Sequence, residues 1–221
     1  MRLALAVLAL AGGLPASAQA ADDDLQIWSA LTVSGAVAPR LTASIELNAR
    51  LVDNADRLGV ILVRPTIAYR ASHKITVALG YTRQVQRNPV GSNVRENRIF
   101  QQLVWLPGKA GEYAFSTRLR LEQRSIEGAD DTGWRARALA RVQRPVSRQV
   151  AAFAQVEGFI ALNDTDWGAR SGFDQSRASA GVNIRVSPGL TVETGYLNRY
   201  LRRAGADRID HVVPVILSLA L

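Results

Sequence analysis

Arginine and glutamate recur at alternate positions along most of this chain, and their chemistry stands out. A guanidinium group is planar, stays charged and binds a carboxylate through two parallel hydrogen bonds, so such residues can neutralise one another or hold an outside anion. The alternation places them on one shared face, together with Gln155. The set expected on this face comprises Glu46, Arg50, Arg64, Glu96, Arg98, Arg118, Arg120, Glu122, Arg124, Arg135, Arg137, Arg141, Glu157, Arg177, Arg185, Glu193 and Arg199.

Patterns typical of catalysis or metal binding are absent from the sequence. The chain has no Cys, and its two histidines are His73, in a turn-like stretch, and His211, which follows Asp210. Neighbours on a strand point to opposite faces, so Asp210 and His211 are not expected to act as a pair. No Gly-x-Ser-x-Gly or Ser-x-x-Lys motif occurs, nor a His-x-Ser pattern of the lipid A deacylase kind. Residues 163–166 lack the Gly and Glu of a calcium loop, so we expect no metal there. Because none of these patterns occurs, we also expect no catalytic residue and no cofactor.

The elements that must position the charged face are β-strands. Between Leu41 and Leu51, apolar residues occupy every second position, and Thr, Ser, Glu, Asn and Arg occupy the others. A strand places each set on one face, whereas a helix would scatter both. Many such segments are long enough to cross a bilayer at a tilt, which takes about 9–11 residues. The eleven expected strands are 26–37, 41–51, 58–70, 74–86, 95–106, 112–125, 133–145, 149–162, 173–187, 190–202 and 208–221.

These segments predict an all-β chain that forms a single up-and-down antiparallel transmembrane β-barrel of about 10–12 strands. Short turns, such as the one containing Pro107-Gly108-Lys109, alternate with longer loops, as they do in outer-membrane barrels. Bacterial single-chain barrels have an even number of strands, so ten and twelve stay open beside the eleven segments. The Arg64-Pro65 step marks a candidate bulge or break, because Pro donates no ladder hydrogen bond.

The N-terminal segment, residues 1–20, has the pattern of a secretory signal peptide. Arg2 precedes an apolar run from Leu3 to Leu14, and a small-x-small site ends at Ala20. Residues 21–221 then form one barrel domain, exported across the inner membrane to the outer membrane of a Gram-negative cell. The apolar run is too short to span about 30 Å of hydrocarbon, and no other stretch approaches about 20 apolar residues, which excludes a helical membrane protein.

The formal net charge is +8, which raises the question of nucleic-acid binding. That function needs basic residues clustered on one surface, whereas here arginines are interleaved with glutamates through nearly every segment. A charged side chain facing lipid at the membrane midplane costs about 2–4 kcal/mol. We therefore expect the charged face to line the barrel interior, and we do not expect a nucleic-acid partner.

Several short stretches resemble one bacterial family. They are Ile27-Trp28-Ser29, the run from Arg64 to Tyr69, the run from Glu96 to Gln102, the run from Arg118 to Arg124, and Asp210-His211. Their succession resembles the domain-of-unknown-function 2490 (DUF2490) family over nearly the whole mature chain. The resemblance implies a fold similar to outer-membrane barrels and carries no assigned activity.

Two interpretations of the charged face stay open. Arg and Glu could fill the lumen as a hydrogen-bonded plug, or the excess of Arg could leave a narrow conduit that favours anions. The leading expectation is therefore a structural or narrow-pore outer-membrane protein without enzymatic activity. The alternatives are an outer-membrane enzyme that hydrolyses lipid or peptide, and a soluble periplasmic ligand-binding barrel. Expected partners are outer-membrane lipid, the barrel-assembly machinery during biogenesis, and small anions.

Overall fold

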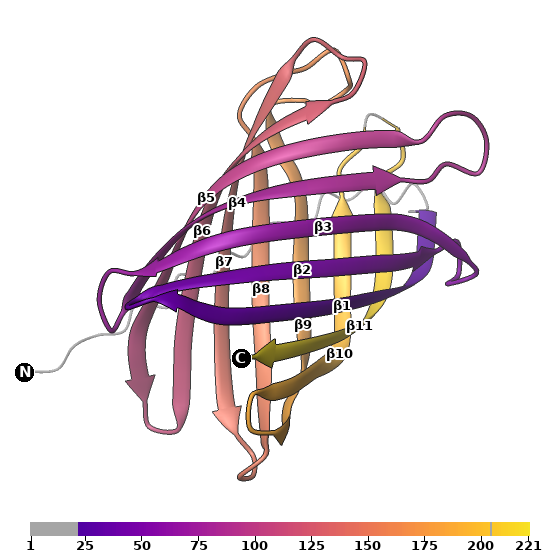
Figure 1. The fold of residues 1–221 in the computed structure, drawn as a ribbon. Helices are drawn as coiled ribbons and strands as arrows, with labels where there is room; N and C mark the ends of the chain where they lie inside the picture. Colours follow the sequence, from indigo (N-terminus) through magenta and orange to yellow (C-terminus); the bar gives the residue numbers. More distant parts are fainter. Residues whose placement is uncertain (1–21, 204) are drawn as a thin grey trace, which may run out of the picture.

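The computed structural model describes residues 22–203 and 205–221, so the predicted signal peptide lies outside the described residues. These residues form a closed barrel of eleven strands (Figure 1). Among them, no helix is long and apolar enough to cross a bilayer. The strands are β1 (Asp22–Ala38), β2 (Leu41–Val52), β3 (Arg57–Arg70), β4 (Ile75–Gln86), β5 (Val94–Ala110), β6 (Tyr113–Ile126), β7 (Thr132–Pro145), β8 (Val150–Ala161), β9 (Gly172–Ser187), β10 (Leu190–Leu201) and β11 (Arg208–Ala220).

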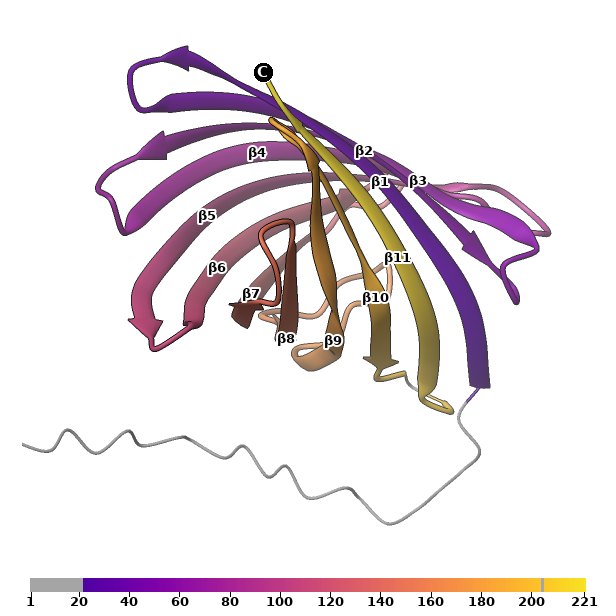
Figure 2. The same ribbon diagram turned by 90° about the horizontal axis from the view of Figure 1, so that it is seen from below.

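A parallel seam between β1 and β11 closes the barrel (Figure 2). All other neighbouring strands pair antiparallel, and the seam runs in one register from Asp22 opposite Arg208 to Ser34 opposite Ala220. With an odd number of alternating strands, the first and the last run in the same direction, so closure has to be parallel. The eleven segments expected from the sequence are confirmed as strands, and the alternatives of ten and twelve strands do not hold for the described residues.

One consequence of the odd count is that β1 begins and β11 ends at opposite ends of the barrel. One end carries turns of two to four residues, and we call it the turn end. The other carries connections of four to ten residues, and we call it the loop end. Asp22 lies at the loop end beside Arg208, whereas Leu221 lies at the turn end beside Ser34, whose carbonyl accepts its backbone N–H.

Pro65 interrupts pairing without breaking its strand. The β3–β4 ladder pairs Val63 with Arg83 and resumes at Thr66 opposite Gly80 in the same register. Since Pro has no N–H to donate, the ladder loses the pairs next to Pro65, while the register on both sides of it is unchanged. A different prediction fails at β5, which continues through Pro107-Gly108-Lys109 to Ala110. The register shifts between Trp105 and Gly108, so that stretch is a bulge and the turn follows at 111–112.

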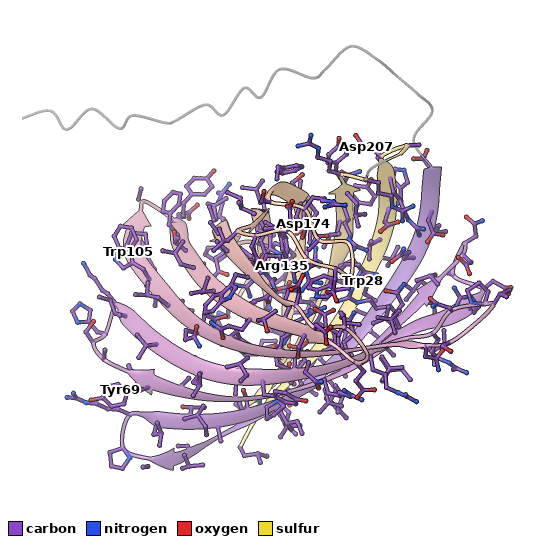
Figure 3. The ribbon with its side chains drawn as sticks, turned by 90° about the horizontal axis from the view of Figure 1, so that it is seen from above. Trp28, Tyr69, Trp105, Arg135, Asp174 and Asp207 are labelled. Atoms are coloured by element: carbon purple, nitrogen blue, oxygen red, sulfur yellow. The ribbon has the colours of Figure 1, made fainter. Side chains whose placement is uncertain are left out.

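The two faces of the sheet differ as the alternation predicts. Large apolar residues are exposed all around the outside, among them Leu47, Leu79 and Leu119. The interior buries charged residues together with a few aromatic and aliphatic side chains. Figure 3 shows Trp28, Arg135 and Asp174 inside the enclosure, while Tyr69 and Trp105 lie at its outer edge. Polar residues face inward and apolar ones outward, the reverse of a water-soluble barrel.

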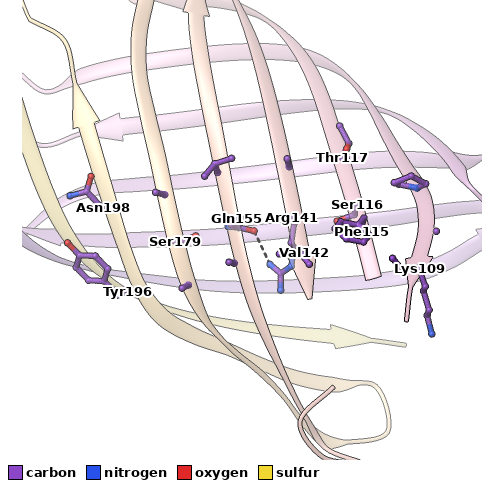
Figure 4. Close-up of a pocket in the computed structure, with 18 residues that line it drawn as sticks. Lys109, Phe115, Ser116, Thr117, Arg141, Val142, Gln155, Ser179, Tyr196 and Asn198 are labelled. Atoms are coloured by element: carbon purple, nitrogen blue, oxygen red, sulfur yellow. Dashed lines mark hydrogen bonds between the residues drawn. The ribbon is translucent and has the colours of Figure 1, made fainter. Parts of the chain in front are cut away.

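Small residues hollow the outer surface along β7, β8 and β9. Ala140, Ala154 and Ala180 line an outer groove of about 860 Å³, whose wall includes Phe115 and Tyr196 (Figure 4). A second outer groove of about 1050 Å³ extends across β3 to β9, with most of its lining on β4 to β8. Both belong to the apolar exterior and are not entrances to the lumen.

Candidate functional site: the charged interior

The structure brings sixteen of the seventeen predicted residues together in the interior, where they either line a central cavity or are buried beside it. Arg185 is the exception, because it is exposed close to the turn at 188–189 and does not line the cavity.

Glu122 forms the most buried part of the network. The residue is 1% exposed, and Arg135 donates to its Oε2 from Nη2 at 2.6 Å and from Nε at 2.9 Å. Arg137 donates to Oε1 at 2.7 Å, and an Arg120 nitrogen lies 3.6 Å from the same oxygen. The register explains this grouping, since Glu122 is directly opposite Arg135 and Arg120 is directly opposite Arg137. Direct cross-strand neighbours have Cβ atoms about 5 Å apart, within easy reach of these side chains.

Glu157 forms a second centre. Arg137 donates to its Oε1 at 2.7 Å and therefore bridges Glu122 and Glu157. Arg118 lies on the same strand as Glu122 but donates to Glu157, at 2.7 Å. Leu139 is opposite both Arg118 and Glu157, so the three residues form one row across β6, β7 and β8. Because Leu139 offers no charge, Arg118 extends across it to the carboxylate.

Smaller ion pairs surround these centres. Glu96 accepts from Arg98 at 2.6 Å and from Arg124 at 2.5 Å. Separate pairs join Arg64 to Glu46 and Arg141 to Glu193, each at 2.8 Å. Bidentate and shared contacts of this kind satisfy buried charges that would otherwise be costly to remove from water.

Aromatic rings lie among the arginines, and the sequence interpretation missed them. Phe159 has the guanidinium groups of Arg137 and Arg177 at 4.4 and 4.6 Å from its ring centre. Phe100 is 1% exposed, with Arg120 at 4.0 Å from the ring. A Cβ on Gly80 would lie 2.2 Å from the Phe100 ring, so glycine makes room for it. The signal was present in the sequence, since these phenylalanines share the parity of the charged residues.

A second group of missed residues lies at the loop end of the seam. Arg208 binds Asp24 and Asp210, each at 2.5 Å, and Arg199 binds Asp210 at 2.9 Å. Asp24 and Asp210 are directly opposite each other in the parallel register. Asp210 is 0% exposed inside the barrel, whereas His211 faces outward with its Nδ1 2.7 Å from the Tyr196 hydroxyl. The two neighbours therefore do not meet.

The loop at 162–171 covers part of the loop end. Trp167 donates from Nε1 to the Asp131 carbonyl at 2.9 Å and stacks beside Arg124. Its ring occupies the space where a Cβ on Gly133 would lie. A hydrogen bond from the Ser171 N–H holds the pKa of the Asp164 carboxyl below its ordinary value, so this polar loop stays anionic. Among the described residues, no group of three or more His, Asp or Glu side chains could hold a metal ion.

The central cavity has a volume of about 410 Å³ and is lined by ten arginines and four glutamates. A vestibule of about 380 Å³ at the loop end shares Arg50 and Arg199 with this cavity. Among the described residues that line the vestibule, Asp53 is the one carboxylate, and the further arginines are Arg57, Arg87, Arg203 and Arg208. Arginines therefore outnumber carboxylates on the walls of both spaces.

A closed sheet with an apolar exterior and an ion-paired interior defines a β-barrel of the outer-membrane type. The family model described as "Protein of unknown function (DUF2490)" matches residues 25–210, and the chain belongs to this family. An uncharacterized protein of Methylorubrum extorquens is 35% identical over 222 residues, covering 98% of this chain and 96% of the relative.

Two solved structures share the fold. LpxR from Salmonella typhimurium superposes with a TM-score of 0.55 at 8% identity, over 86% of this chain and 87% of LpxR. The NanC porin superposes with a TM-score of 0.51 at 12% identity, over 89% of this chain and 99% of the porin. The family resemblance and the barrel class predicted from the sequence are confirmed.

Proposed function

We propose that this chain is a narrow, anion-selective pore of the outer membrane, without enzymatic activity. The observation that carries the proposal is the excess of arginine over glutamate around a central cavity that shares Arg50 and Arg199 with a basic vestibule. A ring of fixed cations in a low-dielectric wall raises the local concentration of anions and repels cations. The fold is compatible with a pore, since NanC, which shares it, is a porin.

The proposal also covers the location of the protein in the outer membrane and its export to that membrane. Residues 1–20 act as a cleaved signal peptide, and the apolar exterior faces outer-membrane lipid after insertion by the barrel-assembly machinery. Polar groups on that exterior pair with each other, as Gln101 and Gln123 do through two reciprocal amide hydrogen bonds of 3.2 and 3.0 Å. Such pairing lowers the cost of an amide in hydrocarbon.

Narrowness follows from the side chains that occupy the interior. Arg135, Arg137 and Glu122 extend from neighbouring strands into the lumen and hold one another there. The remaining cavity is at the small end of the range for ligand sites in proteins, about 300–1,000 Å³. We therefore expect a small conductance. A soluble ligand-binding barrel is disfavoured, because its interior would be apolar and its exterior polar.

Planar bilayers test the pore directly. Refolded protein in a KCl gradient should give small steps of current with a reversal potential on the anion-selective side. The same samples should show a folded band that migrates differently before and after boiling. Membranes that stay silent with correctly folded protein, or a reversal potential on the cation side, would reject the pore in favour of a plugged structural barrel.

The opposite placement of the two strand ends gives an independent prediction. With the turn end facing the periplasm, a tag inserted before Asp22 should bind antibody on intact cells, as should a tag at Gly168 in the longest loop. A tag after Leu221 should bind antibody only after the outer membrane is opened. Labelling of both the Asp22 and the Leu221 tags on intact cells would contradict the parallel seam.

A further inference from the structure

Two lumen arginines lack the carboxylate partners that their neighbours have. Arg50 donates from Nε to the Asn48 side chain at 3.1 Å and makes no ion pair with any described residue. Arg177 reaches a carboxylate oxygen only at 4.0 Å, on Glu157, and that carboxylate is already bound by Arg118 and Arg137 at 2.7 Å. The Nε of Arg177 is buried with no hydrogen-bond partner in the described structure. Unmet donors of a charged group in an enclosed space favour an anionic ligand.

These two arginines gather around one indole ring. The guanidinium carbon of Arg50 lies 3.9 Å from the ring centre of Trp28, and that of Arg177 lies 5.0 Å from it. Arg199 is the third cation, at 5.8 Å, and its charge is balanced by Asp210. The arrangement follows from the register, since Trp28 is opposite Arg50 on β2 and Arg177 is opposite Arg199 across β9 and β10.

The indole N–H of Trp28 is already used in a hydrogen bond within the protein. The Trp28 Nε1 donates to Gln26 at 2.7 Å, and Gln26 in turn donates to Asp24 at 2.8 Å. Trp28 is therefore held rigidly as a platform on which guanidinium groups stack, and their N–H edges stay available for an acceptor. Arg177 also contacts the ring of Phe159, whose centre lies 4.6 Å from its guanidinium carbon, so aromatic rings hold both forks in place before a ligand binds.

The cluster also lies where the two water-accessible spaces meet. Arg50 lines both the vestibule and the central cavity, while Trp28 and Arg177 line the central cavity. An anion that enters from the loop end reaches this point without passing through the Glu122 ion pairs. Binding here needs access from one end only, so it does not depend on conduction through the barrel.

We propose that Arg50 and Arg177, stacked on Trp28, form a binding site for a small molecule that carries a carboxylate or a phosphate group. The two forks would each donate to oxygens of the anion, with Trp28 fixing their orientation. The inference goes beyond the pore, because a barrel that conducts no current can still bind this ligand from the loop end. It identifies a specific site within a lumen whose other charges are mostly paired.

Ligand titration of the full protein in detergent micelles tests this site. Malonate and inorganic phosphate are titrated separately at constant ionic strength, with chloride as the balancing anion, while tryptophan fluorescence and the thermal unfolding midpoint are recorded. We expect a saturable fluorescence change with a rise in the midpoint, since a ligand that binds only the folded state stabilises it. Response to malonate alone assigns a carboxylate ligand, response to phosphate alone assigns a phosphate ligand, and response to both assigns the shared oxyanion chemistry.

Three variants locate the site. Arg50→Gln and Arg177→Gln should each weaken binding by about tenfold or more, the usual effect of losing hydrogen bonds from a charged group. Arg144→Gln is the control, because Arg144 is exposed near the turn end and pairs with Glu112. Trp28→Phe should remove most of the fluorescence change while the midpoint still responds.

The stability of the free variants separates a lost site from a lost fold. Removing an uncompensated cation should leave the midpoint of Arg177→Gln equal to or above that of the unliganded parent. Absence of saturable binding of both probes to folded parent protein would overturn the proposal, as would unchanged affinity in both Arg50→Gln and Arg177→Gln. Saturable binding by protein that gives silent bilayers would retain this site and reject the pore, so the two failures are distinguishable.

Discussion

Replacing Glu122 by glutamine is expected to lower the free energy of unfolding by about 3–5 kcal/mol, the usual effect of removing one partner from a buried ion pair. Glutamine has nearly the same shape, so the change isolates the charge. Both hydrogen bonds from Arg135 to Oε2 would then meet a neutral amide and no longer a carboxylate. Arg137 would keep only Glu157 as a carboxylate partner. Because Arg120 also faces this carboxylate, three cations would be left in contact with one neutral amide.

The measurement is urea unfolding of the refolded barrel in micelles, followed by tryptophan fluorescence and by the shift between boiled and unboiled bands. Glu112→Gln is the matched control, since Glu112 pairs with Arg144 at 2.8 Å but both side chains are more than half exposed. Exposed pairs contribute little, so this variant should unfold with the parent protein. Equal unfolding curves for Glu122→Gln and Glu112→Gln would mean that lumen water replaces the missing charge.

How far the sequence predicts this interior depends on which pairings are local. Alternation alone indicates that Glu122 and Arg135 share a face, and the hairpin from β6 to β7 places them opposite each other. The contact between Arg118 and Glu157 could not be predicted in the same way. It depends on three strands in register and on the absence of charge at Leu139.

The seam lies beyond sequence reasoning for a further reason. Asp24 and Asp210 are separated by nearly the whole chain, and they meet only because β1 and β11 run parallel in one particular register. That register also brings Asp24 within reach of Arg208, whereas Arg199 is directly opposite Asp210 in the local β10–β11 hairpin. Closure of the barrel, which no local pattern encodes, thus decides that Arg208 binds a carboxylate on β1.

Two glycines let β9 and β10 approach each other closely, and a proline lies where pairing is interrupted on the other side of β10. Gly181 and Gly195 are directly opposite each other, and a Cβ on Gly195 would lie 2.2 Å from the Ala180 carbonyl oxygen and 2.6 Å from the Gly181 Cα. On the other side of β10, ladder pairing with β11 stops after Thr194 and resumes at Leu197, around the position of Pro214. Two strands can approach this closely only where neither carries a side chain.

Gly195→Val is therefore expected to prevent formation of the closed barrel. The clash is with backbone atoms, which cannot rotate away, so relief requires that β9 and β10 separate, at a cost of about 3 kcal/mol or more. The readout is loss of the heat-modifiable band after refolding, together with loss of the variant from the membrane fraction of cells.

Gly158→Val provides the comparison, because a Cβ at Gly158 would meet no atom within 4 Å and valine suits an exposed position on a strand. This variant should assemble like the parent, which shows that the loss of a glycine as such is tolerated. Normal assembly of Gly195→Val would show that β9 and β10 do not approach as closely as described.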